Sequence, residues 1–187
     1  MSKIGEKIIN LTEGTKVEVQ HKTLKITGKE GEIQLGILKG LNVEMGDNTV
    51  SVKRKRNDKR TRAMHGLFRS LIANAVAGVE KPWEKNLEVV GTGYNVKMKG
   101  EDLEFKLGYS HPVVFKAVPG IKYKVDEDNK ITVSGVDKQL VGQVSFQIKK
   151  IKPPDVYKGK GIKFEGEKLR IKPGKKAKTI TAGATAA

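Results

Sequence analysis

The sequence predicts an α+β protein with two duplicated domains, each an antiparallel sheet packed against one helix, followed by a basic C-terminal extension. Three observations support this fold class. Short strand patterns recur about 80 residues apart, each half of the chain ends in a helical pattern, and lysine and arginine gather behind the second helical pattern. The domains are therefore expected at residues 1–82 and 83–172, with a basic, flexible tail at 173–187.

The repeated strand patterns alternate apolar and polar residues. Patterns in the first half, at 17–19, 24–26 and 48–52, have counterparts in the second half at 96–98, 103–105 and 129–133. Such alternation is typical of antiparallel strands that bury one face and expose the other. The duplicated patterns therefore predict a similar sheet in both halves.

Each half then changes to apolar residues at the three-and-four spacing of a helix. The stretch SGVD at 134–137 is expected to be the N-terminal capping signal of the second helix, and the proline pair at 153–154 to end it. Gly78 is expected to end the first helix, and the domain boundary is expected between 80 and 83. The apolar positions are Met64, Phe68, Leu71, Ile72 and Ala75 in the first helix and Leu140, Val144, Ile148 and Ile151 in the second.

The composition predicts an anionic partner. The 187 residues include 37 lysines and arginines against 21 acidic residues, a net charge of +16 that attracts nucleic acid or an anionic surface. With no cysteine, the chain has no disulfide or thiolate metal site, and a reducing cytosol is expected. No apolar run approaches the roughly 20 residues that would span a bilayer, so a soluble protein is expected.

The most informative segment for function is 152–164, KPPDVYKGKGIKF, which follows the second helix. Its lysines at 158, 160 and 163 are expected to meet a polyanion, and Gly159 and Gly161 to let the backbone approach that partner closely. Tyr157 could stack on a base or pack its ring against the sheet, and the sequence leaves both open. Residues 148–178 hold twelve cations against three acidic residues, a charge pattern typical of a nucleic-acid face.

A second basic stretch, 53–62, is interpreted as an insertion that separates strand from helix in the first half, and electrostatic contact with RNA is favoured over a mobile basic loop. Behind the second helix, residues 165–187 have few apolar groups and are expected to be disordered without a partner. Beyond 165, a solvated lysine tail is as plausible as an RNA contact.

Catalytic and metal motifs are absent from the sequence. The three histidines lie far apart without partners at metal-binding spacing, and His65 is expected at the surface or half-buried on the first helix. The glycines at 91 and 93 lack the third glycine of a dinucleotide site, so they predict a turn, and residues 126–129 predict a hairpin turn rather than a calcium loop. No enzyme activity, cofactor or metal is expected.

Several of these segments together resemble the ribosomal protein L6 family of the large subunit, in its bacterial or organellar form. The similar stretches are PDVYKGKGI at 154–162, VGTGY at 90–94, LGYSHPV at 107–113 and DKQLVGQ at 137–143. The likeness covers the chain to about residue 175. It departs at 151–156, where many bacterial members have arginines and this chain has one lysine, which lacks the bidentate fork of arginine.

The resemblance implies a structural protein that binds large-subunit ribosomal RNA, mainly through its second domain, near the factor-binding region and the sarcin-ricin loop. Neighbouring ribosomal proteins and nearby translational GTPases are the other implied partners, with no DNA and no membrane, in a cytoplasmic or organellar ribosome. The predicted RNA-binding residues are Lys149, Lys152, Tyr157, Lys158, Gly159, Lys160, Gly161, Lys163, Arg170, Lys175 and Lys176. The 53–62 stretch adds Arg54, Lys55, Arg56, Arg60 and Arg62.

Two other functions compete with RNA binding. A protein–protein adaptor would recruit a strand on its exposed sheet edges and use the basic tail for solubility. A peripheral membrane protein would need a basic amphipathic helix with an apolar face, and the sequence lacks one. The steepness with which salt weakens RNA binding would separate the adaptor from the RNA-binding protein.

Overall fold

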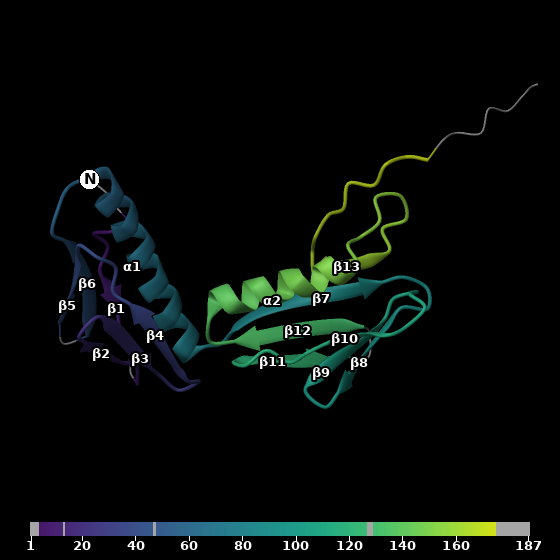
Figure 1. Cartoon of the computed structure of the whole chain (residues 1–187), viewed down its shortest axis with the longest axis horizontal. Coiled ribbons are helices and arrows are strands. Elements are labelled where there is room, and N and C mark those ends of the chain that lie inside the picture. The colour runs from purple at the N-terminus through teal and green to yellow at the C-terminus, as the bar shows by residue number, and fades with distance from the viewer. Residues whose placement is uncertain (1–3, 13, 47, 127–128, 175–187) are drawn as a thin grey trace, which may run out of the picture.

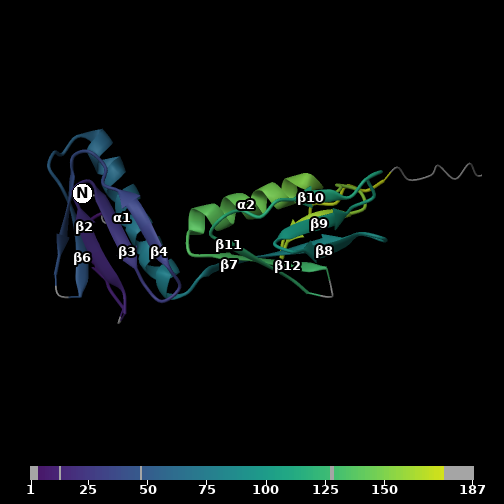
Figure 2. The same cartoon turned by 60° about the horizontal axis from the view of Figure 1, so that its bottom comes forward.

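The computed structural model describes residues 4–12, 14–46, 48–126 and 129–174. Within these residues the chain forms two units, each with one helix, that follow one another along the long axis of the molecule (Figure 1). Figure 2 shows the same arrangement from a second direction, with the units meeting at the end of the first helix.

The first unit holds two three-stranded antiparallel sheets, in the orders β1-β6-β5 and β2-β3-β4. Helix α1 packs against β3, β4 and β6, and its buried Phe68 and Ile72 complete a core with Leu24 and Ile26. The elements are β1 Ile9–Asn10, β2 Lys16–Gln20, β3 Thr23–Thr27, β4 Glu32–Gly36, β5 Leu41–Met45, β6 Thr49–Arg54 and α1 Lys59–Glu80.

The second unit has the same plan with one strand more. Its antiparallel sheets run in the orders β11-β12-β7-β13 and β10-β9-β8, and α2 packs on β7, β12 and β13. The buried residues Leu87, Phe105 and Ile148 lie in its core. The elements are β7 Trp83–Val90, β8 Asn95–Lys99, β9 Asp102–Lys106, β10 Val113–Phe115, β11 Ile121–Val125, β12 Lys130–Gly135, α2 Lys138–Ile151 and β13 Gly161–Phe164.

The two units match strand for strand. β7, β12 and β11 pair in the order of β1, β6 and β5, and β8 to β10 repeat the meander of β2 to β4. This duplication confirms the predicted fold class of two α+β repeats. β13 has no counterpart among the described strands of the first unit, so residues 152–164 are an addition specific to the second unit. The last four of these residues, expected as loop, form this strand.

The ends of the second helix agree with the sequence, whereas the predicted end of the first helix is wrong. The Asp137 carboxylate accepts a hydrogen bond from the Gln139 backbone N–H (2.8 Å), and α2 ends at Ile151, before the prolines. α1 instead continues past Gly78 to Glu80. Gly78 is buried where the helix meets the Val136 carbonyl of the second unit, so close that a side chain there would collide with it.

The stretch 53–62 does not separate strand from helix as a segment of its own, contrary to the prediction. Its first two residues belong to β6, where Arg54 pairs with Leu41 of β5, and its last four form the first turn of α1. The connecting loop is only 55–58, and Asp58 caps the helix by accepting from the Thr61 N–H (3.4 Å). Lysine and arginine are good helix formers, which explains why a basic stretch starts the helix early.

Specific contacts join the two units. The Trp83 indole N–H donates to the Asn74 carbonyl (3.1 Å), and the Lys138 ammonium donates to the Asn74 side-chain oxygen (3.3 Å) while it lies 4.1 Å from the centre of the Trp83 ring. Val136 packs against the core of the first unit. These contacts hold α1 against the start of α2. The domain limits predicted at 82 and 172 stay predictions.

Candidate nucleic-acid interface

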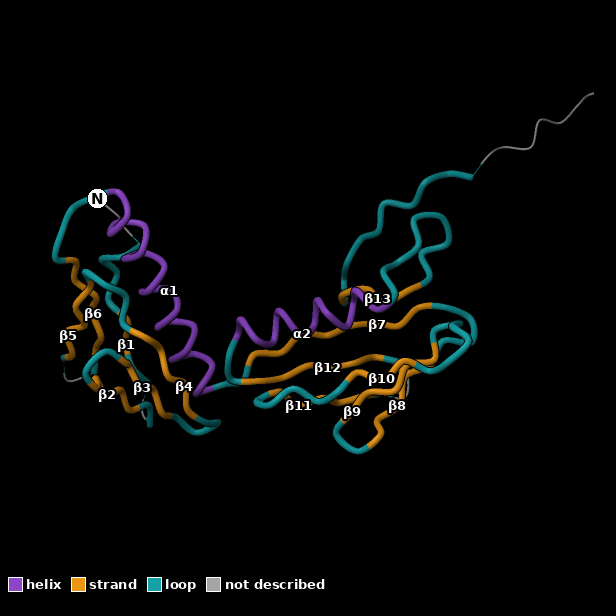
Figure 3. Tube along the Cα trace, in the orientation of Figure 1, coloured by secondary structure: helices purple, strands orange, loops and turns teal. Residues whose placement is uncertain are grey.

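Three loops meet at the end of the second unit that lies away from the first unit (Figures 1 and 2). They are 91–94 between β7 and β8, 107–112 between β9 and β10, and 152–160 between α2 and β13. We refer to these loops as the three-loop end. Figure 3 shows residues 152–160 rising as loop beside the C-terminal end of α2.

Two lysines tie the loops together. The Lys160 ammonium donates to the Thr92 hydroxyl (2.8 Å), and the Lys152 ammonium lies 4.3 Å from the centre of the Tyr109 ring. The Tyr109 hydroxyl also donates to the Ile151 carbonyl at the end of α2 (2.9 Å). Because Thr92 and Tyr109 carry no charge, both lysines are positioned while their positive charge remains uncancelled.

Asp155 fixes the conformation of the 152–160 loop. Its carboxylate accepts from the backbone N–H groups of Tyr157 (3.3 Å) and Lys158 (3.2 Å), and its carbonyl accepts from the Gly159 N–H (2.9 Å). Tyr157 is left 59% exposed, so in this structure its ring does not pack into the sheet. The Lys158 side chain is also exposed, and within the described residues it has no hydrogen-bond or ion-pair partner.

The glycines of this loop have structural roles inside the chain. Gly159 adopts a φ of 68°, which side-chain-bearing residues avoid. Gly161 is buried with a φ of 146°, and a Cβ there would lie 2.7 Å from the Pro153 carbonyl oxygen. The chain itself therefore requires glycine at 161, whether or not a partner approaches its backbone.

Two of the predicted RNA-binding lysines form ion pairs within the chain. The Lys149 ammonium binds both oxygens of the Glu167 carboxylate (2.6 and 2.7 Å), and this hydrogen bonding is the main reason that the pKa of Glu167 is lowered. The Lys163 ammonium lies 2.9 Å from the Glu88 carboxylate on β7. Lys149 and Lys163 therefore offer less net charge to a phosphate than Lys152, Lys158 and Lys160 do.

Residues 165–172 are held against the second unit, so the expectation of disorder from 165 onward is wrong for them. The Glu165 N–H donates to the Asn86 carbonyl (3.0 Å), and the Lys172 N–H donates to the Val156 carbonyl (2.8 Å). The predicted site residue Arg170 is exposed on this segment. The described residues end at 174. Lys175, Lys176 and the part of the predicted flexible tail from residue 175 onward therefore lie outside them.

The predicted basic residues of the first unit gather around the start of α1. Lys55, Arg56, Arg60 and Arg62 are exposed there. Arg54 is instead half-buried, and its guanidinium lies 3.6 Å from the Glu6 carboxylate. This basic cluster lies in a different unit from the three-loop end.

The histidine of α1, expected at the surface or half-buried, is buried. His65 is 2% exposed, and its Nε2 lies 2.7 Å from the Val52 carbonyl oxygen, so Nε2 must carry the hydrogen. Nδ1 is then free to accept from the Arg54 guanidinium (3.4 Å). No local pattern indicates this burial, because Val52 and Gly5 come from other segments, and the Gly5 backbone packs closely on the ring.

Sequence reasoning did not include Thr92 and Tyr109 among the candidate site residues. Their signal was present in the sequence, because both lie in stretches that resemble the L6 family, at 90–94 and 107–113. The fold brings these two stretches next to the third one, at 154–162. The three stretches that resemble the L6 family therefore lie together on one surface of the second unit.

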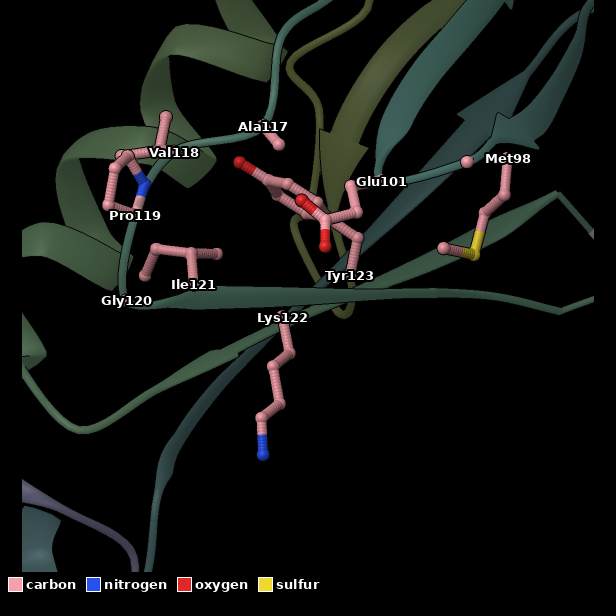
Figure 4. Close-up of a pocket in the computed structure, with 10 residues that line it drawn as sticks. Met98, Glu101, Ala117, Val118, Pro119, Gly120, Ile121, Lys122 and Tyr123 are labelled. Atoms are coloured by element: carbon pink, nitrogen blue, oxygen red, sulfur yellow. The ribbon is translucent and has the colours of Figure 1, made fainter.

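A cavity of about 530 Å³ lies elsewhere in the second unit, lined by residues of 98–101 and 117–123 (Figure 4). Met98, Val118 and Pro119 give it an apolar wall, and Glu101 is its acidic residue. Burial raises the pKa of the Tyr123 hydroxyl there. Lys122 also lines the cavity and balances the charge of Glu101, so the lining has no excess of positive charge for a nucleic acid.

Among the described residues, histidine and acidic side chains form no cluster of three or more that could hold a metal ion. In the same part of the chain, neither helix is long and apolar enough to cross a membrane.

Duplicated sheet-and-helix units with a cationic three-loop end place the chain in the class of two-domain α+β proteins with a basic surface. The sequence profile of the family described as ribosomal protein L6 matches residues 11–81 and 90–165. The chain therefore belongs to the ribosomal protein L6 family, whose members are structural constituents of the large ribosomal subunit and not enzymes.

Similar proteins cover nearly the whole chain. Large ribosomal subunit protein uL6 of Hydrogenobaculum sp. is 47% identical over 177 residues, which are 95% of this chain and 97% of that protein. The proteins of the same name from Leptospira biflexa and Salinispora arenicola are 46% and 43% identical, and each match covers 95% of this chain and 99% of the relative.

Proposed function

We propose that this protein binds large-subunit ribosomal RNA through the three-loop end of its second domain. The observation that carries the proposal is that Lys152 and Lys160 are held by the neutral side chains of Tyr109 and Thr92, beside the exposed Lys158 and Tyr157. Uncancelled cations on a fixed loop suit a phosphate backbone, and an exposed aromatic ring suits an unpaired base.

The mechanism is recognition by shape and charge. Lys152, Lys158 and Lys160 neutralise phosphates and release the counterions condensed on the RNA. The Asp155 hydrogen bonds hold the loop in one conformation before binding, which lowers the entropy cost of ordering it. Duplex RNA hides its base edges in a deep groove, so contacts to backbone, minor groove and tertiary fold dominate.

The family membership supports a location in the assembled ribosome. The protein sits near the factor-binding region and the sarcin-ricin loop, with neighbouring ribosomal proteins beside it and translational GTPases docking nearby. Its ribosome is cytoplasmic or lies in an organellar matrix. Residues 1–82 and 83–172 act as its two domains, and the second makes the main RNA contact.

Crosslinking of the full chain to large-subunit ribosomal RNA, followed by sequencing of the RNA and mass spectrometry of the peptides, tests this function. The crosslinks should fall on a few RNA positions and on peptides from 91–94, 107–112 and 152–164. A diffuse pattern over unrelated RNAs would remove the specific ribosomal function. Capture of a protein strand on a sheet edge, with weak and salt-insensitive RNA binding, would favour the adaptor instead.

A further inference from the structure

The outward face of α2 carries an exposed aromatic ring that the core does not use. Phe146 is 60% exposed, whereas Phe68 and Phe105 are fully buried, and Phe115 and Phe164 are partly buried against the second core. The opposite side of α2 supplies Val141, Val144 and Ile148 to that core. Phe146 therefore faces solvent because of its helical position.

The residues around Phe146 form one stripe along the helix, which we call the α2 outer face. Its exposed members, at spacings of three and four residues, are Gln139, Gln143, Phe146, Gln147 and Lys150. Within the described part of the chain, the side chains of Gln143, Gln147 and Lys150 have no hydrogen-bond or ion-pair partner. The stripe thus offers one ring, amide groups and one cation to a partner.

Charge favours RNA as that partner. Helix α2 contains no aspartate or glutamate, so nothing on the outer face repels a phosphate. Lys150 differs in this respect from its neighbour Lys149, whose charge is taken up by Glu167. A protein partner would be expected to place acidic groups opposite Lys150. RNA is favoured because the same face borders the 152–160 loop, for which RNA is the proposed partner.

The α2 outer face is continuous with the three-loop end. Lys150 lies in the last turn of α2, two residues before Lys152, and residues 152–160 rise on the same side of the sheet as the helix (Figure 3). Phe146 lies one helical turn, about 6 Å, before Lys150. An RNA segment that contacts Lys152 can therefore extend along α2 toward Phe146.

We propose that the α2 outer face is a second RNA contact, in which Phe146 stacks on an unpaired base of large-subunit ribosomal RNA while Lys150 binds the adjacent phosphate. This contact rests on the RNA-binding function proposed above. The flanking glutamine amides can hydrogen-bond base or sugar edges. Aromatic rings stack on any base, so this contact adds affinity without demanding one sequence.

The test compares full-length variants for binding to transcribed large-subunit ribosomal RNA. F146L keeps an apolar side chain of similar size and removes the ring, F146W keeps a ring, and L67A removes an exposed apolar side chain from α1 of the first unit as the control. F146L should weaken binding at least about fivefold, the lower end of what stacking of one base contributes. F146W and L67A should bind within about twofold of the unmodified chain. When RNA binds, the fluorescence of F146W should fall more than that of the unmodified chain, which contains Trp83.

A second measurement identifies the partner in the assembled subunit. A photoreactive phenylalanine analogue at position 146 should crosslink to RNA. If F146L binds RNA like the unmodified chain, or the crosslink goes to a ribosomal protein, the α2 contact is wrong while RNA binding by the three-loop end stands. If the unmodified chain fails to bind the RNA, both proposals fail.

Discussion

The two units share a sheet-and-helix plan, but some of their cations have different roles. In the first unit, the Arg69 guanidinium donates to the carbonyls of Lys7 (3.1 Å) and Ile8 (3.4 Å), and Arg54 faces Glu6, so these arginines hold the N-terminal segment in place. In the second unit, Lys152 and Lys160 are held by uncharged groups. The comparison teaches that the number of cations does not locate a polyanion site, whereas the charge of their partners helps to locate it.

The largest expected effect tests the core of the second unit. Ile148→Asp places a carboxylate at a fully buried position, which should cost more than about 4 kcal/mol and unfold this unit. Hydrogen exchange should show fast exchange in β7 to β13 while the first unit stays protected. Gln147→Asp, on the exposed side of the same turn, is the control and should change the free energy of unfolding little. A soluble I148D chain with an unchanged circular-dichroism spectrum would contradict the core assignment.

The next effect concerns the 152–160 connection to β13, which has no counterpart among the described residues of the first unit. Gly161→Ala combines an unfavourable φ with a Cβ 2.7 Å from the Pro153 carbonyl oxygen, so it should lower the free energy of unfolding by about 1–3 kcal/mol. Gly166→Ala has a similar backbone problem at a φ of 74° but open space around the Cβ, and should cost about 1 kcal/mol. Urea denaturation measures the free energy of unfolding of both variants. Equal costs would mean that packing against the prolines is unimportant.

A smaller effect tests how the loops are held together. Tyr109→Phe removes the 2.9 Å hydrogen bond to the Ile151 carbonyl and keeps the ring beneath Lys152, so it should cost about 1 kcal/mol and leave RNA affinity nearly unchanged. Tyr109→Leu removes the ring as well, and should also weaken RNA binding because Lys152 is no longer positioned. If both variants bind RNA like the unmodified chain, Tyr109 does not position Lys152.

The smallest effect is a pH dependence of the free energy of unfolding that arises from Glu167, in the segment after β13. Its hydrogen bonds to Lys149 lower the pKa of Glu167 in the folded state, so the pair contributes stability above the ordinary glutamate pKa of 4.5. That contribution is lost as the pH falls below 4.5 and through the lowered pKa of the folded state. Because the carboxylate is partly exposed, the contribution is expected to stay below about 1 kcal/mol. Glu167→Gln should flatten this part of the stability profile, and an unchanged profile would assign the acid sensitivity to other groups.

Local signals in the sequence predicted part of the regular structure. Alternation predicted β2, β3, β6, β8, β9 and β12, and the capping signal at 134–137 and the prolines after Ile151 predicted both ends of α2, because these features act within a few residues. Gly78 misled because glycine ends many helices, while here it makes room for the Val136 carbonyl across the joint between the units. Such a contact depends on tertiary structure and leaves no local pattern.

The sequence predicted which basic residues form the candidate site, but not how the fold brings them together. The sequence indicated the basic loop and left the position of the Tyr157 ring open, and the register of β13 on β7 is what sets Lys163 opposite Glu88. In the same way, only the fold brings Thr92 to Lys160 and Tyr109 to Lys152. Which lysines keep their charge therefore could not be predicted from charge counts.

The salt dependence of binding to large-subunit ribosomal RNA tests most directly whether the three-loop end makes the phosphate contacts. The variant Lys158→Ala with Lys160→Ala is compared with Lys16→Ala with Lys22→Ala, which removes two exposed cations from the first unit. Each lost phosphate contact reduces the slope of log affinity against log salt by about 0.7–0.9. The 158/160 variant should therefore have a slope shallower by about 1.4–1.8 and an unchanged circular-dichroism spectrum, while the 16/22 variant keeps the slope of the unmodified chain. Equal slopes for all three proteins would contradict the account.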